Sequence, residues 1–308
     1  MAESRLGPKA NERPSPIRVW LLAARPATLP AAIVPVLAGT AAASWATPFF
    51  DFRPGPFVAA LIGALLLQIA TNFANDYADF KSGADNVDRM GPTRVTHAGL
   101  VTAEQMKAAI LLAFGAAAAV GIYLIVVAGW PILVVGGAAI VAGFAYTGGP
   151  WPYGYHGLGD VFVFVFFGIV AVMGSYFVQV ERLTWEAAAV AIPVGMPVTA
   201  ILVVNNLRDI DTDRDSGKRT LAVVLGASVA RREYVLLMLL PYLLVPIFAA
   251  ADLMPWASMQ AWAVLPLALL LVRKVVEGTS GPALNLVLKQ TGQAHLLFGV
   301  VLAASYLW

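Results

Sequence analysis

The sequence predicts an all-α membrane protein with nine transmembrane helices, and two observations support this prediction. Hydrophobic residues make up 59% of the 308 residues and charged residues only 12%, whereas a soluble domain is about half apolar and about a quarter charged. The charged residues are also clustered, which leaves long uncharged stretches between them. A helix that crosses a bilayer needs roughly 17–25 mostly apolar residues, and these stretches have that length.

Eight uncharged stretches follow one another along the chain, and each is expected to contain at least one membrane-spanning helix. The stretch 108–159 is about twice the required length. Gly129, Trp130 and Pro131 interrupt it, so we expect two helices joined by a tight hairpin there. The other stretches are 26–50, 54–75, 161–180, 187–207, 234–251, 253–272 and 290–308.

The distribution of basic residues orients these helices. If the polar N-terminal segment 1–20 lies in the cytoplasm, eighteen of the 20 Lys and Arg residues fall on the cytoplasmic side, and only Arg53 and Arg182 fall on the other side. The cytoplasmic basic residues lie in segments 1–25, 76–107, 208–233 and 273–289. The positive-inside rule describes this asymmetry. We therefore expect a cytoplasmic N-terminus, a C-terminus on the opposite side, and a single domain over residues 1–308.

Two further counts exclude classes of protein. The chain contains no cysteine, which excludes disulfide bonds, catalytic thiolates and cysteine-ligated metal sites. The formal net charge is +2, which is far from the strongly basic footprint of a nucleic-acid-binding protein. We therefore expect membrane lipid and small molecules as partners, and no nucleic acid.

Eight of the 18 acidic residues fall in two short segments, 72–94 and 205–220, each at the expected cytoplasmic end of a helix. In each segment one asparagine and two aspartates are spaced by three or four residues, so they share one helix face. These residues are Asn72, Asp76 and Asp79 in the first segment, and Asn205, Asp209 and Asp213 in the second.

Carboxylates that share a helix face repel one another unless a cation lies between them. The nearby Lys and Arg residues are expected in loops, so a hard cation is the better candidate. Mg²⁺ is usually held by a few carboxylates together with substrate phosphates. Two aspartate faces that meet across a bundle therefore indicate a diphosphate site with bridging Mg²⁺. A solvated helix end is the alternative, and we keep it for Asp88, Asp211 and Asp215, which leave the shared faces.

Both segments resemble the aspartate-rich motifs of the UbiA superfamily of intramembrane prenyltransferases. The superfamily's first motif commonly reads NDxxDxxxD. Here residues 75–79 read NDYAD, Gly83 stands where the last Asp would be, and Asp85 follows two residues later. This variant resembles the naphthoate branch of the superfamily, as does the sequence NNLRDIDTDRDSGKRTLAVVLG at 205–226. Further similar blocks lie at 24–41, 90–102, 146–168 and 284–299.

The resemblance implies a UbiA-type bundle in the cell inner membrane, with an active site that faces the cytoplasm. It implies transfer of a polyprenyl group from polyprenyl diphosphate to 1,4-dihydroxy-2-naphthoate with loss of CO₂, which gives the demethylated precursor of menaquinone. Two Mg²⁺ ions are the expected cofactor. A sister acceptor, 4-hydroxybenzoate or homogentisate, is the alternative within the superfamily. Outside it, the alternatives are a non-catalytic lipid-binding protein and a secondary transporter, although transporters favour binding sites near the bilayer midplane.

Spacing and resemblance together assign roles to individual residues. The expected catalytic residues are Asp76, Asp79, Asp209 and Asp213. The expected metal ligands are these four with Asn72, Asn75 and Asp85. The expected diphosphate ligands are Lys81, Arg94, Asn205, Asn206, Arg208, Lys218 and Arg219. Arg25 and Pro26 are expected to mark the entry of the first span, and Arg25 is also the candidate partner for the carboxylate of the acceptor.

Two expectations concern the surroundings of this site. The rings of Tyr146, Tyr153 and Tyr155 either shield a cationic intermediate or anchor their loop at the membrane interface. The glycines of 115–121 and 136–143 are expected to mark close helix packing. The prenyl tail needs an apolar groove that is open to lipid, and the sequence does not locate it.

Overall fold

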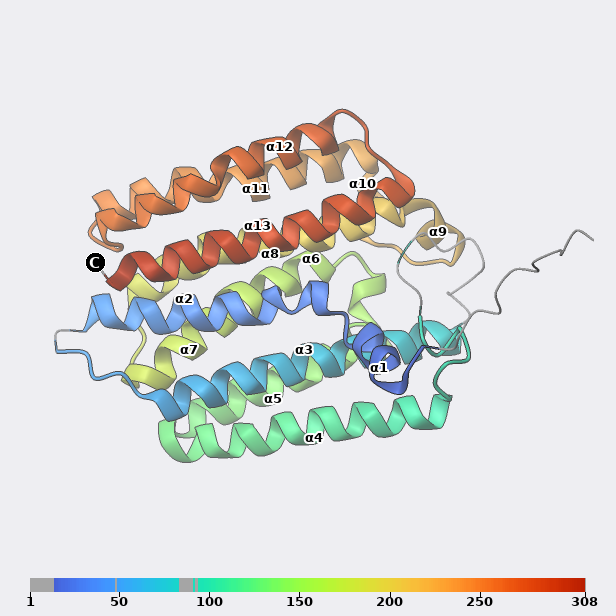
Figure 1. Cartoon of the computed structure of the whole chain (residues 1–308), viewed down its shortest axis with the longest axis horizontal. Coiled ribbons are helices and arrows are strands. Elements are labelled where there is room, and N and C mark those ends of the chain that lie inside the picture. Colours follow the sequence, from blue (N-terminus) through green and yellow to red (C-terminus); the bar gives the residue numbers. More distant parts are fainter. Residues whose placement is uncertain (1–13, 48, 83–90, 92–93, 308) are drawn as a thin grey trace, which may run out of the picture.

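The computed structural model describes residues 14–47, 49–82, 91 and 94–307, and helices and loops account for these residues. The long helices lie side by side with their axes roughly along one direction (Figure 1). The first half of the chain forms α1 (Pro16–Ala24), η1 (Pro26–Thr28), α2 (Pro30–Ala46), α3 (Pro54–Ser82), α4 (Ala103–Ala128) and α5 (Trp130–Ala145). The second half forms η2 (Tyr153–Tyr155), α6 (Gly159–Val163), η3 (Phe164–Val170), α7 (Ala171–Val180), α8 (Trp185–Arg208), α9 (Ile210–Asp215), α10 (Leu221–Leu225), α11 (Ala227–Ala250), η4 (Trp256–Val264), α12 (Leu265–Val276), η5 (Gly281–Ala283), α13 (Leu284–Ala304) and η6 (Ser305–Leu307).

Seven helical segments of the described chain are long and apolar enough to cross a membrane. The segment from α1 to α2 passes the same test as a helix pair bent by 52°, which would make an eighth span. α5 has 16 residues, so its length is about 24 Å, shorter than the ~30 Å hydrocarbon core of a bilayer. The all-helical membrane class is confirmed, whereas the ninth span, assigned to α5, stays a prediction.

The interruption predicted inside 108–159 separates α4 from α5. Thr102 and Gln105 begin α4 with a capping box, in which each side chain accepts the other residue's backbone N–H. Gly129 ends α4 with a φ of 85°, which glycine adopts without steric penalty. Pro131 lies in the first turn of α5, where its missing N–H is tolerated. The chain therefore reverses direction between the two helices within a tight hairpin (Figure 1).

The segment expected to be a polar arm before the first span contains a helix. The side chain of Ser15 accepts the backbone N–H of Arg18 at 3.4 Å and so caps the start of α1. After α1, Arg25 adopts a φ of 52° in the left-handed region, and Pro26 follows. α1 consequently lies across one end of the bundle instead of continuing along it (Figure 1).

α8 lies at the centre of the bundle. Its membrane-length window is 78% buried, against 22% for that of α4 at the edge. Glycines allow close packing nearby: a Cβ on Gly39 of α2 would lie 2.1 Å from the carbonyl oxygen of Val172 in α7. A Cβ on Gly168 of η3 would lie 2.7 Å from the Cα of Gly195 in α8. Backbone approach of this kind gives membrane helices their van der Waals contact.

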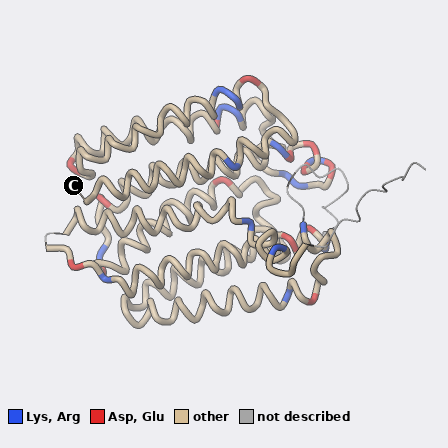
Figure 2. Tube along the Cα trace, in the orientation of Figure 1, with Lys and Arg blue, Asp and Glu red and all other residues tan. Residues whose placement is uncertain are grey.

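Charged residues lie mainly at the two ends of the bundle (Figure 2). One end, where α1 and α9 lie, is called the motif end below, because the described parts of both aspartate-rich segments lie there (Figures 1 and 2). α3 reaches the motif end because it has 29 residues and continues beyond the uncharged stretch 54–75. Its last turns carry Asn75, Asp76 and Asp79.

Replacing Gly39 by alanine is expected to destabilise the bundle. The added Cβ would meet the backbone of α7 at 2.1 Å, and overpacking of this kind typically costs about 1–3 kcal/mol. Thermal unfolding of the detergent-purified protein should therefore show a lower midpoint for Gly39→Ala. Gly115→Ala is the matched control, because no atom lies within 4 Å of a Cβ at that position of α4. Equal midpoints for the two variants would contradict the close contact between α2 and α7.

Candidate active site

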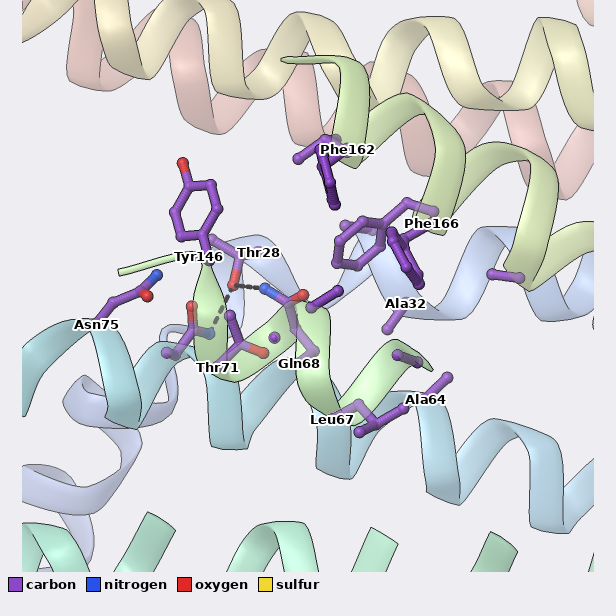
Figure 3. A pocket seen from close by; sticks show the side chains of 18 of the residues that line it. Thr28, Ala32, Ala64, Leu67, Gln68, Thr71, Asn75, Tyr146, Phe162 and Phe166 are labelled. Atoms are coloured by element: carbon purple, nitrogen blue, oxygen red, sulfur yellow. Dashed lines mark hydrogen bonds between the residues drawn. The ribbon is translucent and has the colours of Figure 1, made fainter. Parts of the chain in front are cut away.

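A cavity of about 760 Å³ lies among α2, α3, α4, α5, the α6–α7 segment and α8. Asn75, Gln68 and Ala64 follow one side of α3 along it (Figure 3). Phe162 of α6 and Phe166 of η3 face them from the opposite wall (Figure 3). The cavity is polar at the motif end and mostly apolar elsewhere, so it runs from charged groups into the interior of the bundle.

Both aspartate-rich segments line the polar end of this cavity. α3 contributes Asn75 and Asp79, which lie four residues apart on one helix face. Asp209 lies between α8 and α9, and Asp213 lies in α9. Two segments that are far apart in the sequence therefore present oxygen atoms to one volume.

Asp79 is buried and is held by cationic and polar partners from other parts of the chain. Its Oδ1 accepts hydrogen bonds from Lys218 Nζ at 3.0 Å and from the Tyr155 hydroxyl at 2.9 Å, and its Oδ2 pairs with Arg94. Lys218 Nζ also lies 3.9 Å from Asp213 Oδ1 and 4.7 Å from the centroid of the Tyr155 ring. Lys218 therefore bridges the two aspartate-rich segments, and its charge-assisted bonds are strengthened by burial.

Arg208 holds the second segment in place. Its guanidinium is buried and donates to both carboxylate oxygens of Asp209, at 2.8 and 2.5 Å. The same group donates to Asn205 Oδ1 at 2.9 Å and to Asn285 Oδ1 at 2.9 Å. Asn285 belongs to α13, so Arg208 ties the end of α8 to the last helix while it orients Asp209.

Asp213 is paired more loosely than Asp79, because Lys218 Nζ lies 3.9 Å from Asp213 Oδ1 and 3.0 Å from Asp79 Oδ1. Burial raises the pKa of Asp213 to about 6, and the charges of Asp209 and Asp79 add to this shift while Lys218 and Arg208 oppose it. The raised pKa means that the charged form of Asp213 is destabilised where it stands. An added cation at the polar end would relieve that penalty.

Some predicted site residues lie away from the cavity. The two carboxylate oxygens of Asp76 accept the backbone N–H groups of Val95 and Thr96, each at 3.1 Å, and Asp76 does not line the cavity. Lys81 and Arg219 are exposed and do not line it either. Asp85, the remaining predicted ligand of the first segment, lies outside the described residues.

The other predicted residues line the cavity, with different bonding. Arg25, Arg94, Asn205, Asn206, Arg208 and Lys218 are among its lining residues. Asn72 also lines it, but its amide NH₂ donates to the carbonyl oxygen of Ala24 at 2.9 Å and to Thr28 Oγ1 at 3.0 Å. Gln68 Nε2 donates to the same Thr28 oxygen at 3.1 Å (Figure 3). Asn72 thus fastens the turn between α1 and α2 to α3.

The three predicted tyrosines line the cavity in different ways. The Tyr153 hydroxyl donates to the carbonyl oxygen of Ala142 at 2.9 Å, and its ring stacks on Phe162 with centroids 4.0 Å apart. Tyr146 packs edge-on against Tyr153 at 5.4 Å, and burial raises the pKa of its phenol well above the usual value. Tyr155 instead contacts Asp79 and Lys218. Tyr146 and Tyr153 thus form a neutral aromatic wall beside the polar end.

The glycines of α4 and α5 do not behave as the sequence suggested. Gly121, Gly136 and Gly137 line the cavity, and no atom lies within 4 Å of a Cβ built at any of them. Gly143 alone among these four does pack closely, since its Cβ would lie 2.7 Å from Thr71 Oγ1. The expectation of close packing is therefore wrong for Gly121, Gly136 and Gly137, whose missing side chains leave space for the cavity.

Sequence reasoning missed several polar residues that support the site. Thr147 donates to Asn75 Oδ1 at 2.7 Å, and Gln68 and Thr28 make the contacts described above. An isolated polar side chain in an apolar span is a recognised sign of function, and this signal could have identified Gln68. Thr147 carries no such signal, because its loop is polar and its partner is distant in sequence.

The donor chemistry of the polar end fits a hard divalent cation. Asn75, Asp79, Asp209 and Asp213 offer amide and carboxylate oxygens, and Arg94 and Lys218 lie close by. Within the described residues no three acidic or histidine side chains form one metal-binding group. Mg²⁺ does not require such a group, because it usually takes one or two carboxylates and completes its octahedron with water and substrate phosphates.

Comparison with known proteins shows which family the chain resembles over most of its length. The model of the UbiA prenyltransferase family matches residues 32–306. The chain is 39% identical over 289 residues to the protein of Escherichia coli (strain K12) named 1,4-dihydroxy-2-naphthoate octaprenyltransferase, with 91% of this chain and 92% of that protein covered. It is 38% identical over 286 residues to the Mycobacterium tuberculosis protein of the same name, with 93% and 96% covered.

Solved structures share the fold at low sequence identity. The apo UbiA homologue from Aeropyrum pernix K1 matches with a TM-score of 0.67 at 15% identity, covering 90% of this chain and 96% of that one. The UbiA homologue from Archaeoglobus fulgidus bound to GPP and Mg²⁺ matches with a TM-score of 0.66 at 13% identity, covering 94% and 100%. The family match extends over most of the chain and the curated relatives cover nearly all of it, so the chain belongs to the UbiA prenyltransferase family.

Proposed function

We propose that this protein transfers a polyprenyl group from polyprenyl diphosphate to 1,4-dihydroxy-2-naphthoate, with loss of CO₂ and with Mg²⁺, to give demethylmenaquinol, the hydroquinone form of demethylmenaquinone. One observation carries the proposal: a single cavity joins a polar end, lined by both aspartate-rich segments, to a long apolar wall. A polyprenyl diphosphate has the same division, with a charged head and an apolar tail. The names of the relatives support the naphthoate as acceptor.

The diphosphate head would lie at the polar end. Asn75, Asp79, Asp209 and Asp213 would hold the metal, which we take to be two ions because oxygen donors approach from two sides. When bound, Mg²⁺ neutralises charge that develops on the leaving diphosphate. Lys218 lies between Asp79 and Asp213, so its ammonium group is placed to bind diphosphate oxygens.

The remaining expected diphosphate ligands divide into two groups. Arg94, Asn205, Asn206 and Arg208 line the cavity and would surround the diphosphate. Arg208 would act mainly by orienting Asp209, which its guanidinium already bonds through both oxygens. Lys81 and Arg219 are exposed, so they would attract the anionic substrate to the entrance and not bind it inside.

The reaction follows from this arrangement. The allylic C–O bond breaks and its electron pair leaves with the diphosphate, while the prenyl carbon takes on cationic character. The ring carbon that bears the carboxylate attacks this carbon, and the C–CO₂ bond then breaks so that its electrons restore the aromatic ring. Tyr146 and Tyr153 present neutral rings at the cavity, where they would exclude water and stabilise the cation through their π faces.

Arg25 is our proposed partner for the carboxylate of the acceptor. It lines the cavity at the turn between α1 and η1, where its backbone adopts a left-handed conformation. Arginine binds carboxylates with two parallel hydrogen bonds, so it can set the orientation of a flat acid. A carboxylate bound by Arg25 would lie beside the α1–η1 turn.

We also propose the arrangement in the membrane. Nine spans, with α5 as the short one, would place the N-terminus and the motif end in the cytoplasm and the C-terminus on the other side. The clustering of basic residues in segments 1–25, 76–107, 208–233 and 273–289 supports this orientation. The active site would then face the cytoplasm at the cell inner membrane, in a single domain over residues 1–308.

The proposal is tested by product formation in liposomes with polyprenyl diphosphate and 1,4-dihydroxy-2-naphthoate, with and without Mg²⁺. Asp79→Ala and Asp213→Ala should each lower kcat/KM at least about 100-fold, because each removes a group that supports charge in the transition state. Asp211→Ala is the matched control, since the side chain of Asp211 is 73% exposed and pairs with Arg214 in the same helix. Product with 4-hydroxybenzoate and none with the naphthoate would move the protein to a sister acceptor.

Lys218→Ala should raise the KM for polyprenyl diphosphate about 10- to 100-fold, because a charged hydrogen bond of this kind is worth ~1.5–3 kcal/mol. The KM for the naphthoate should change far less, since Lys218 contacts both aspartate-rich segments and not the α1–η1 turn. Initial rates measured against each substrate in turn separate the two constants. The reverse order of effects would assign Lys218 to the acceptor.

Gly136→Leu should shorten the prenyl chain that the protein accepts. The new side chain would fill open space along the apolar wall, and contacts of this size in an apolar pocket alter relative rates by roughly tenfold or more. Turnover of octaprenyl diphosphate should fall at least about tenfold relative to geranyl diphosphate. Gly115→Leu is the control on α4, outside the cavity. An equal loss with both diphosphates would remove Gly136 from the tail site.

A further inference from the structure

We propose that Asn72 and Asp76 are positioning residues: they hold the two chain segments that carry Arg25 and Arg94 over the polar end of the cavity, and they are not metal ligands. This inference rests on the proposed function for its kinetic consequences. Its geometric basis is independent, because it concerns hydrogen bonds between α3 and its neighbours.

The end of α3 carries two polar rows that face different partners. Asn75 and Asp79 are four residues apart and line the cavity. Asn72 and Asp76 are also four residues apart, and this row is turned by about 60° from the first, because each of its members lies three residues before its counterpart and successive residues of a helix advance by about 100°. The second row bonds to two covering segments, the α1–η1 turn and the turn that follows Arg94.

Asp76 is matched to a pair of backbone donors. It is 2% exposed, and its Oδ2 and Oδ1 accept the N–H groups of the consecutive residues Val95 and Thr96, at 3.1 Å each. Both partners are buried, and Val95 belongs to an apolar cluster with Phe73. A buried carboxylate that accepts two N–H groups satisfies charge and donors together, so it fixes the backbone one residue from Arg94.

The backbone that Asp76 holds carries Arg94, which pairs with a carboxylate at the cavity. Its guanidinium pairs with Asp79 Oδ2, in the row that faces the cavity. Asp76 therefore places Arg94 beside Asp79 through the backbone, while Asp79 receives the side chain. A single helical turn of α3 thus organises both the carboxylate and the cation at the polar end.

Asn72 does the same for Arg25. Its Nδ2 donates to the carbonyl oxygen of Ala24 at 2.9 Å and to Thr28 Oγ1 at 3.0 Å. Thr28 Oγ1 in turn donates to the carbonyl oxygen of Arg25 at 2.9 Å and accepts from Gln68. Two successive carbonyls around Arg25 are therefore held. A non-glycine residue with a φ of 52° is strained and persists only when its surroundings hold it.

Asn72→Asp separates the two roles, because it keeps the oxygen and adds charge but removes the amide donor. A metal ligand would tolerate this change or improve, with an equal or lower Mg²⁺ concentration at half-maximal rate. A positioning residue would not: its donor to the carbonyl of Ala24 is lost, so the KM for the naphthoate should rise about tenfold at unchanged Mg²⁺ dependence. An unchanged KM for the naphthoate, together with a lower Mg²⁺ concentration at half-maximal rate, would overturn the assignment of Asn72 as a positioning residue.

Asp76→Asn and Asp79→Asn form a matched pair for the first segment. Asp76→Asn replaces one acceptor by a donor, so backbone amide exchange at Val95 and Thr96 should accelerate about 10- to 100-fold while half-saturating Mg²⁺ stays within about twofold of wild type. Asp79→Asn should do the opposite: the half-saturating Mg²⁺ concentration should rise, and exchange at these two amides should stay unchanged. A higher half-saturating Mg²⁺ concentration for Asp76→Asn, together with unchanged exchange at Val95 and Thr96, would overturn the proposal.

Hydrogen exchange also separates this inference from the proposed function. It is measured on the purified full-length protein in detergent and needs no substrate. If wild-type protein forms no prenylated product, the proposed function fails, and accelerated exchange in Asp76→Asn still supports the positioning role. If product forms and exchange at Val95 and Thr96 is unchanged in Asp76→Asn, the positioning role fails alone. Should Asp76→Asn not fold, the Asn72→Asp arm decides the proposal.

Discussion

The buried carboxylate of Asp79 is the point on which the site depends. It lies at the end of an apolar bundle, where an isolated charge would be severely destabilised, so it requires cationic and hydrogen-bonding partners. These partners come from three separate segments: Arg94 follows α3, Tyr155 lies in η2, and Lys218 follows α9. Satisfying this one group therefore brings together segments that are far apart in the sequence. The second aspartate-rich segment is drawn in by the same contact, because Lys218 also approaches Asp213.

The apolar part of the cavity depends on a different constraint, the absence of side chains. Glycines are used in two ways in this bundle. Gly39 and Gly168 allow backbones to touch, whereas Gly136 and Gly137 leave open space beside the cavity. The first use stabilises the bundle around α8, and the second gives up packing and leaves open volume along the apolar wall, where the proposed function would place the prenyl tail. α5, which carries the open glycines, is also the short helix that packs mainly against α3 and α4.

The sequence predicted the helices well because charge-free length is a strong signal in a bilayer protein, and the two segments that it singled out both contribute residues to the polar end of the cavity. It did not predict that Asn75 and Asp79 line the cavity whereas Asp76 turns to the backbone of Val95 and Thr96. Spacing by three or four places Asn72 and Asp76 on one face as readily as Asn75 and Asp79, and only the packing of α3 against its neighbours distinguishes the two rows. Lys81 and Arg219 were placed at the site from loop proximity, which carries no periodicity. The expectation of close packing fails for Gly136 and Gly137 of α5 because close packing and an open wall require the same residue type.

The charge balance at the polar end explains why acidic groups can remain there without a dense metal-binding cluster. Asp79 and Asp209 are already paired with Arg94, Lys218 and Arg208. The cations that Asp79 holds in the free protein are the same type of group that an incoming diphosphate needs. Under the proposed function, a substrate that arrives with its own divalent cations would add negative and positive charge together, so the carboxylates would turn from Lys and Arg to metal while Lys and Arg turn to phosphate. The polar end would then exchange partners without leaving an unpaired buried charge, which a charged reaction centre at the end of an apolar bundle requires.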